Sequence, residues 1–521
     1  MTEIRRNKLL SMFVTVILIV FLCSFCSLAD EIQPKKLTNS EGFVYTLNED
    51  GTAEITGYTG KEKKLSVPAQ LDGHTITSIG EKAFQHQKAL EEITIPETVK
   101  AIHSHAFSHC VSLTALNLPD TLETIDNGAF EFCSKLSEVN IPDSVISFGK
   151  SVFHGCTGLK KVIVSENQPI LKTKDGILFS KDELTLIWYS ATRKDASFSI
   201  PKGTKEIRKG AFSYAKAKMI IIPDTVDTIE PSSFVSCPQL TEVNIPPLVT
   251  KLDSAFPGCD KLARINVDKG NTIYYSEDGV LFSKPENALV IYPSGRKETK
   301  YTVPDGIEII MRNAFENAHL KEIRLSSTLR IIQSNAFART DKLIKIELPE
   351  GVQELGSDCF VSSSLTEINI PDSVTEMTKT LFRYCDKLKT IQVSENHPLL
   401  AIMDKALVNK DTMTLFWYPL PEKTASYQVP AGIKIIGFGA FENNNNLKEV
   451  ILSEGVEEIK SRAFVRCSNL TRVVLPESLK QIDKDAFSNE KGGLIDATYV
   501  VVKGSYSENF FKEYGATIEY Q

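Results

Sequence analysis

The sequence predicts a solenoid, in which one short unit repeats along an axis and each copy adds a strand to a parallel β-sheet. Three observations predict this fold class. Phenylalanine recurs every 22 or 23 residues, an alternating apolar segment follows it, and three longer intervals of 59 residues divide the copies into blocks. The fourteen phenylalanines form blocks of four, three, four and three: Phe84, Phe107, Phe130, Phe153, Phe212, Phe234, Phe256, Phe315, Phe337, Phe360, Phe382, Phe441, Phe464 and Phe487.

Residues 1–29, before the repeats, have the pattern of a secretory signal peptide. Basic residues precede an apolar run over 9–25, and small residues end at Ala29. This order is typical of a cleaved export signal, so we expect an exported protein, secreted or held at the cell surface. An uncleaved membrane anchor and a lipoprotein attached through Cys23 or Cys26 are the alternatives.

The chain expected after cleavage, residues 30–521, is acidic. Loss of three basic and one acidic residue leaves 56 basic and 65 acidic side chains, a net charge of −9. Nucleic acid is therefore excluded as a partner, because its binding needs a concentrated basic surface. No second segment is long enough to span a bilayer, so contact with a membrane is expected only through the signal or an anchor. The sequence leaves the oligomeric state open.

The repeat unit is clearest in AFEFCSKLSEVNIPDSVISFGKSVF, residues 129–153. Its L-x-x-V-x-I segment, 136–141, alternates apolar and polar residues, which is typical of a strand with one buried face. Pro142 ends the strand because proline has no N–H to donate. Val145 and Phe148 return to the core, and the small residue before each repeat phenylalanine allows a tight helical turn towards the next strand. One unit cannot bury its own apolar face, so the copies are expected to stack.

These units resemble the BspA-like subclass of leucine-rich repeats, found in secreted and surface proteins of bacteria and some protists. The resemblance covers nearly all of the chain after residue 29. It implies a leucine-rich-repeat solenoid with a curved parallel β-sheet of about fourteen 22–23-residue repeats, interrupted by three inserts. It also implies a non-catalytic protein that binds other proteins, such as an adhesin.

One repeat position, three residues after the phenylalanine, is cysteine in seven copies: Cys110, Cys133, Cys156, Cys237, Cys259, Cys385 and Cys467. Other copies place alanine, threonine or serine there, which indicates a small packing site where free cysteine serves as a compact apolar residue. Stacked side chains point the same way, so we predict free thiols. Disulfides between neighbouring copies are the alternative in an exported protein.

The segment IHSHAFSHC, residues 102–110, looks in isolation like half of a zinc site. The repeat accounts for Cys110 as a packing residue, so no metal and no cofactor are predicted. What remains of the zinc interpretation is His86 beside His109, which share one repeat position and would stack in adjacent copies. The alternative is a pair of surface histidines.

The three long intervals carry similar inserts of about 36 residues. Asp175-Gly176, Asp278-Gly279 and Asp404-Lys405 lie at the same distance from the preceding phenylalanine, and an apolar–polar–apolar segment follows each pair. This pattern predicts a β-hairpin in each insert. Lys405 stands where the other inserts have glycine, which allows a different turn there.

Trp188 and Trp417 occupy one equivalent position in the first and third inserts, and Ile291 occupies it in the second. One interpretation is that the rings attach the hairpin to the solenoid. The other is an aromatic platform for a ligand such as a carbohydrate, because exposed aromatic residues anchor interfaces.

The predicted organisation gives each segment a boundary. A strand-rich region before the repeats, with a hairpin at Asp50-Gly51, would cap the open edge of the sheet. The predicted segments are a signal peptide 1–29, an N-terminal β cap 30–80, repeat blocks 81–163, 201–267, 304–393 and 430–490, hairpin inserts 164–200, 268–303 and 394–429, and a C-terminal cap 491–521.

The candidate binding residues are those that the strand pattern points to solvent, at its third and fifth positions. They are polar, of mixed charge and rich in asparagine, as expected of a binding face or of a solvated sheet whose asparagines bond one another. The candidates, with the two tryptophans, are Glu92, Asn117, Glu138, Asn140, Glu242, Asn244, Glu367, Asn369, Trp188 and Trp417.

The sequence predicts no enzyme, because it contains no nucleophile elbow, phosphate loop or zincin motif. The function that the pattern and the resemblance favour is adhesion to an extracellular protein of the matrix, of a host cell or of a bacterial surface. A structural protein of the cell envelope and a carbohydrate-binding module that uses the insert aromatics are the alternatives.

Overall fold

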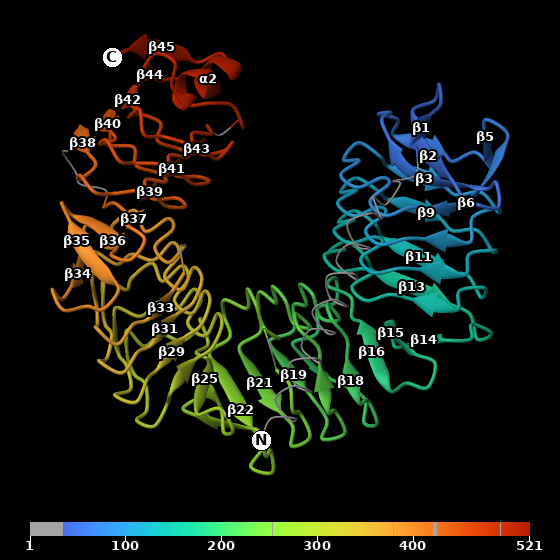
Figure 1. Ribbon diagram of the computed structural model, residues 1–521. Helices are drawn as coiled ribbons and strands as arrows, with labels where there is room; N and C mark the ends of the chain where they lie inside the picture. Colours follow the sequence, from blue (N-terminus) through green and yellow to red (C-terminus); the bar gives the residue numbers. More distant parts are fainter. Residues whose placement is uncertain (1–34, 253, 379, 420–424, 490) are drawn as a thin grey trace, which may run out of the picture. The chain divides into compact units, whose positions relative to one another are not determined.

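The computed structural model describes residues 35–252, 254–378, 380–419, 425–489 and 491–521 (Figure 1). The predicted signal peptide, with Cys23 and Cys26, lies outside these residues. The described residues form two compact units, which divide between Ile170 and Leu171. Each unit is a stack of coils with parallel β-strands, as the repeat pattern predicted.

The L-x-x-V-x-I segments form the strands of what we call the main sheet, which pair in parallel and in register from coil to coil. In the first unit these strands are β4 (Lys64–Ser66), β7 (Glu92–Thr94), β9 (Ala115–Asn117), β11 (Glu138–Ile141) and β13 (Lys161–Val164). In the second unit they are β17 (Ser197–Ser199), β19 (Met219–Ile221), β21 (Glu242–Ile245), β22 (Arg264–Val267), β26 (Lys300–Thr302), β28 (Glu322–Arg324), β30 (Lys345–Glu347), β32 (Glu367–Ile370), β34 (Thr390–Val393), β38 (Ser426–Gln428), β40 (Glu449–Ile451) and β42 (Arg472–Val474).

Most coils also contribute a second, two-residue strand that the sequence pattern did not predict. These strands build a second parallel sheet at the place where the apolar pair after the proline returns to the core. They are β8 (Ala101–Ile102), β10 (Thr124–Ile125) and β12 (Ser147–Phe148) in the first unit, and β18 (Glu206–Ile207), β20 (Thr228–Ile229), β27 (Ile309–Ile310), β29 (Ile331–Ile332), β31 (Glu354–Leu355), β33 (Glu376–Met377), β39 (Ile435–Ile436), β41 (Glu458–Ile459) and β43 (Gln481–Ile482) in the second.

The segment around each repeat phenylalanine is a run of tight turns, so the predicted helical turn is wrong. Ala106 N–H donates to His103 O and Ser108 N–H to His105 O, across three residues each, while His105 has a left-handed φ of 56°. The intervening amides bond to the next coil, as Phe84 N–H does to Ala106 O at 2.8 Å. Amides that serve the neighbouring coil cannot also close the i→i−4 bonds of an α-helix.

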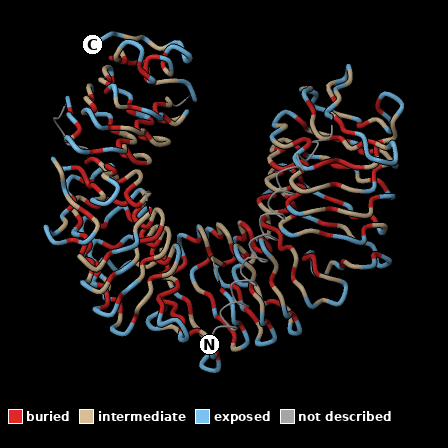
Figure 2. The backbone as a smooth tube through the Cα atoms, viewed as in Figure 1, coloured by how far each residue is buried: buried red, intermediate tan, exposed pale blue. Residues whose placement is uncertain are grey.

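The core of each coil stack is a column of the repeat phenylalanine rings, which we call the aromatic ladder. Phe84 and Phe107 stack with ring centroids 5.1 Å apart, and Phe315 and Phe337 are 5.0 Å apart. The buried residues appear as red stripes that recur in every coil of Figure 2. Removing these rings from water is the main term that holds neighbouring coils together.

Each insert contains three antiparallel strands, and the third of them joins the second sheet in parallel. The strands are β14 (Leu171–Lys174), β15 (Ile177–Ser180) and β16 (Thr185–Trp188), then β23 (Tyr274–Glu277), β24 (Val280–Ser283) and β25 (Ala288–Ile291), then β35 (Leu400–Met403), β36 (Ala406–Asn409) and β37 (Thr414–Trp417). The tyrosine after each third strand takes a position in the aromatic ladder. Tyr292, for example, lies 5.2 Å from Phe315 and donates its N–H to Ala314 O.

The turn of the third insert has the same backbone as the others, although glycine is replaced. Asp404 and Lys405 have φ of 44° and 70°, against 48° and 80° for Asp278 and Gly279. The different turn that Lys405 allowed is therefore absent, and Lys405 is held in a left-handed conformation that costs a non-glycine residue about 1–2 kcal/mol.

Both ends of the described chain carry additional strands. At the first end these are β1 (Leu37–Thr38), β2 (Phe43–Leu47), β3 (Ala53–Tyr58), β5 (Gln70–Leu71) and β6 (His74–Ile79), and β2 and β3 pair antiparallel around Asp50-Gly51. At the other end, β44 (Thr498–Val501) and β45 (Thr517–Tyr520) extend the main sheet. Between them lies α2 (Tyr506–Glu513), which is capped by Ser505.

Candidate functional site

The main sheet exposes the two strand positions that the sequence pattern assigned to solvent. On β11, Val139 and Ile141 are buried, whereas Glu138 and Asn140 are exposed. The same alternation recurs on β21 and β32, so six of the candidates lie on one face of the sheet in their own unit. A strand in this geometry directs alternate side chains to opposite faces, and the buried set fixes which face is free.

In the first unit the candidates lie on three strands of this face. Glu92 forms an ion pair with Lys64 at 2.8 Å, and Asn117 is exposed on the adjacent strand β9. Glu138 and Asn140 lie on β11, with Lys161 opposite Glu138 on β13. This part of the face is polar and open.

In the second unit the candidates Glu242 and Asn244 take part in a local hydrogen-bond network. Asn266 on β22 donates through Nδ2 to both Glu242 and Asn244, the latter at 3.1 Å. Asparagines do bond one another here, as one of the two interpretations of the sequence expected. Their polar capacity is partly used within the sheet.

The other candidates in the second unit, Glu367 and Asn369 on β32, line a groove of about 330 Å³. The neighbouring strands contribute Lys345 and Glu347 from β30 and Gln392 from β34. The ammonium group of Lys345 lies 3.3 Å from Glu367 and 3.6 Å from Glu347, and these carboxylates raise the pKa of Lys345. We call this site the face groove. It brings both charge signs and two amides together on three adjacent strands.

The insert tryptophans are not on the open face. Trp188 is 5% exposed, and Trp417 is half-buried with its ring centroid 5.8 Å from that of Phe382. Their placement favours the interpretation in which the rings attach the insert to the solenoid.

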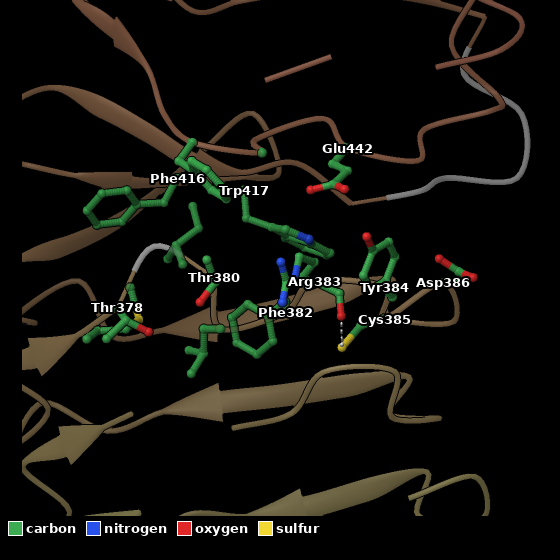
Figure 3. A pocket seen from close by; sticks show the side chains of 15 residues that line it. Thr378, Thr380, Phe382, Arg383, Tyr384, Cys385, Asp386, Phe416, Trp417 and Glu442 are labelled. Carbon is green, nitrogen blue, oxygen red and sulfur yellow. Dashed lines mark hydrogen bonds between the residues drawn. The ribbon is translucent and has the colours of Figure 1, made fainter. Parts of the chain in front are cut away.

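Trp417 lines a small cleft where the third insert meets the coil before it, shown in Figure 3. The indole lies beside Arg383 and Tyr384, and Glu442 is on the opposite wall. The cleft has a volume of about 30 Å³, room for one or two water molecules. We call it the third cleft.

Charged groups surround the third cleft in pairs. Arg383 lies 2.9 Å from Asp358 and its guanidinium is 5.4 Å from the Tyr384 ring centroid. Arg462 forms an ion pair with Glu442, and its Nη2 is 3.5 Å from the Tyr384 hydroxyl. These contacts fill and brace the junction between the insert and the preceding coil.

A family model of the "BspA type Leucine rich repeat region" matches residues 70–181, 187–277, 295–414 and 421–495, most of the chain. The chain belongs to the BspA-type leucine-rich repeat family. No curated protein matches this sequence.

Several solved structures of bacterial leucine-rich repeat proteins are similar to this BspA-type chain. A leucine rich cell surface protein from Faecalibacterium prausnitzii is 26% identical, with 85% of this chain and 95% of that chain covered and a TM-score of 0.38. Leucine-rich repeat proteins from Eubacterium ventriosum (18% identity, 91% and 92% covered, TM-score 0.33) and Bacteroides ovatus (20% identity, 93% and 99% covered, TM-score 0.30) are also similar.

The repeat cysteines of this BspA-type protein are free and buried, as predicted. The Cys133 thiol donates to Phe107 O at 3.2 Å, and the same bond to the preceding coil recurs at Cys110 and Cys237. Burial raises the pKa of Cys110 to about 12, so the thiolate is scarce at neutral pH. The cysteine in this position is a packing residue with a weak hydrogen bond.

Two histidines of the first unit, His86 and His109, lie in a row of tilted ring contacts. His86 and His109 lie 4.7 Å apart, and His109 lies 4.6 Å from Phe132. His103 contacts Asp126 at 2.8 Å and Glu54 at 3.3 Å. No group of three or more potential metal ligands comes together among the residues that the structure describes.

Helices of membrane-spanning length and hydropathy are missing from the described parts of the chain. Sequence reasoning missed the face groove as a site, because it selected glutamate and asparagine positions without Lys345 and Gln392. The strand register links these residues, and an alignment of the repeats by strand would have placed them side by side. It also missed the third cleft, whose lining comes from four separate segments.

Proposed function

We propose that this protein is an exported, non-catalytic solenoid that binds another protein through the exposed face of its main sheet. The observation that carries the proposal is the face groove, where Lys345, Glu367 and Asn369 point to solvent from neighbouring strands. Solenoids bind partners on extended faces of this kind. Membership of the BspA-type family supports a protein partner.

The chemistry of the face groove favours a polar partner surface that offers both charges. Lys345 forms ion pairs with both Glu347 and Glu367, and the Glu347 side chain is 84% exposed. A cationic group of a partner can therefore bind Glu347 while Lys345 stays paired with Glu367. Asn369 and Gln392 add amide groups that donate and accept hydrogen bonds. An extracellular matrix, host-cell or bacterial-surface protein is the partner class that the export signal in the sequence supports.

The experiment that tests this proposal is solid-phase binding of the purified protein to a panel of matrix and cell-surface proteins, with a glycan array in parallel. Glu367→Lys should weaken binding to any protein hit by about tenfold or more, because it breaks the pair with Lys345 and reverses a charge in the groove. Glu477→Lys is the matched control, since this exposed glutamate makes the same change of net charge away from the groove.

Three results would contradict the proposal. Equal binding by both variants and the parent would remove the face groove as the site. A glycan signal without any protein signal would favour the carbohydrate-binding alternative, although the burial of Trp188 already withdraws one of its two aromatic residues. Silence on both panels would favour a structural role in the cell envelope.

A further inference from the structure

The second insert contains a cleft at the same structural position as the third cleft. Corresponding lining residues are 126 positions apart in the sequence, as Ile291 and Trp417 are. Ile291 pairs with Leu281 on β24 in the same register in which Trp417 pairs with Leu407 on β36. We call this site the middle cleft. The two clefts are copies of one junction between an insert and the coil before it.

Several walls of the middle cleft are the same as in the third. Phe256 and Cys259 take the places of Phe382 and Cys385, and Glu316 takes the place of Glu442. The position, the backbone and one acidic wall of the cleft are therefore shared.

Three large side chains of the third cleft are replaced by small ones in the middle cleft. Ile291 stands for Trp417, Pro257 for Arg383 and Gly258 for Tyr384. The middle cleft has a volume of about 350 Å³, against about 30 Å³ for the third. A space of this size is within the range of sites that hold small organic groups. Other lining positions differ as well, since Val290 stands for Phe416 and Arg312 for Phe438, but the indole is the largest group that the middle cleft lacks.

The middle cleft also contains a buried polar group that lacks a well-formed hydrogen bond. Tyr292 is 2% exposed and lines the cleft, its hydroxyl makes no well-formed hydrogen bond within the described chain, and the Arg296 guanidinium lies 5.3 Å from its ring centroid. The equivalent Tyr189 of the first insert donates to Asp195 at 2.7 Å. In the second insert that place is taken by Glu298, which lies 3.1 Å from Arg296 instead. A buried hydroxyl without a hydrogen bond lowers the stability of the fold, and a water or ligand that bonds to it removes this cost.

We propose that the middle cleft is a socket for a tryptophan side chain presented by the protein partner. This inference rests on the proposed function, and it names the group that the partner supplies. The chain itself fills the equivalent space with Trp417, which packs on the ladder residue Phe382, so an indole is the group whose shape the junction fits. In the middle cleft the same contact would be made to Phe256. Aromatic residues that fill such pockets dominate the affinity of many interfaces.

The test uses N-acetyl-tryptophanamide as the probe, with N-acetyl-leucinamide as the control ligand, and saturation-transfer NMR on the purified protein. The parent should bind the tryptophan probe saturably and in preference to the leucine probe. Ile291→Trp should lose this binding, because the new indole fills the socket as Trp417 does. Trp417→Ile should gain a second site, since it opens the third cleft. Thermal unfolding of each variant confirms that the fold is intact.

Two results would overturn the socket: no saturable binding by the parent, or equal binding by a folded Ile291→Trp variant. Binding to the protein hits of the solid-phase assay then identifies the occupant. Loss of partner binding in Ile291→Trp, with probe binding kept in Glu367→Lys, supports the proposal. Undiminished partner binding by Ile291→Trp overturns the occupant and leaves the proposed function standing. Probe binding without any protein hit overturns the proposed function and the partner's tryptophan together, and leaves a site for free aromatic molecules.

Discussion

The middle and third clefts are two copies of one junction with different contents. Both lie where an insert joins the coil before it, and both are bounded by a ladder phenylalanine, Phe256 in one and Phe382 in the other. In the third cleft Trp417 rests on the phenylalanine ring, and the free volume is about 30 Å³. In the middle cleft Ile291 leaves about 350 Å³ open.

This difference teaches that the backbone of the repeat sets where a cleft can form, and side-chain volume decides whether it is filled. The inserts have the same strand register and nearly the same turn dihedral angles. A repeat protein can therefore vary its binding sites by changing a few side chains at a fixed position. The backbone hydrogen bonds between coils do not depend on these side chains, although the packing at the junction does.

The largest expected effect that separates the two clefts is on stability. Trp417→Ala should lower the free energy of unfolding by about 2–4 kcal/mol, because it removes a ring packed on the core and leaves a cavity. Ile291→Ala, at a site already open, should cost about 1 kcal/mol. Urea unfolding followed by circular dichroism measures both. Equal losses would mean that Trp417 contributes no more packing than Ile291 and would break the comparison.

Cysteine labelling tests how open each cleft is. Cys259 and Cys385 are both 3% exposed and line the middle and third clefts respectively. Burial raises the pKa of Cys385 to about 11, so it should resist alkylation at pH 7.5. Cys259 should react with iodoacetamide several-fold faster, since the reagent can enter the larger space.

The labelling is read by mass spectrometry of peptides after limited reaction of the native protein. Cys110, which is 0% exposed and lines neither of these two clefts, is the internal control and should also stay unmodified. Faster labelling of Cys385 than of Cys259 would contradict the difference in volume.

Substitutions in the hairpin turns of the third and second inserts should have smaller effects on stability, and these effects should have opposite signs. Lys405→Gly should stabilise the protein by about 1 kcal/mol, because Lys405 has a left-handed φ of 70° that glycine adopts without strain. Gly279→Ala should destabilise it, since φ is 80° and an added Cβ would lie 2.8 Å from a side-chain carbon of Arg264. Thermal unfolding compares the pair, and a loss of stability in Lys405→Gly would show that the lysine side chain makes a contact that outweighs the strain.

The smallest expected effect concerns the acidic wall of the middle cleft and its pH dependence. Burial raises the pKa of Glu316, although Arg339 nearby opposes the shift. A carboxyl whose pKa is higher in the folded protein than in the unfolded chain favours folding when protonated. Its contribution to stability is therefore lost as the pH rises through the unfolded and then the folded pKa. Glu316→Gln should flatten that part of the stability profile above about pH 4.

Unfolding midpoints measured between pH 4 and pH 7 test this expectation. Glu477→Gln, on the exposed surface, serves as the control. A steeper fall in stability with rising pH in Glu316→Gln than in the parent would contradict the direction of the shift.

Part of the fold could be predicted because the same local sequence pattern recurs in many copies of the repeat. The alternation in 136–141 identified the buried and exposed positions of β11, and the register carries them to every copy. The free thiols followed from the range of residues at one position. The second sheet could not be predicted in this way, because strands of two residues, such as β10, show no alternation.

The candidate site was predicted only by position. Glu367 and Asn369 were identified as exposed, but the groove they line depends on the length and pairing of Lys345 and Gln392 on neighbouring strands. The sequence shows that Ile291 is equivalent to Trp417, but it does not show that a cleft stays open beside Ile291. The alternation alone does not say that this position faces a gap in the aromatic ladder.

The sequence by itself determined the coil, its period, the face that meets solvent and the places where inserts interrupt it, because each of these is a local pattern repeated at a fixed spacing. Only the tertiary structure decided which side chains meet. The middle cleft combines Phe256, Ile291, Tyr292, Arg312 and Gln333, which come from separate segments of the chain. Whether such a junction is filled or open depends on the sum of side-chain volumes brought together there, and that sum exists only when the coils are stacked.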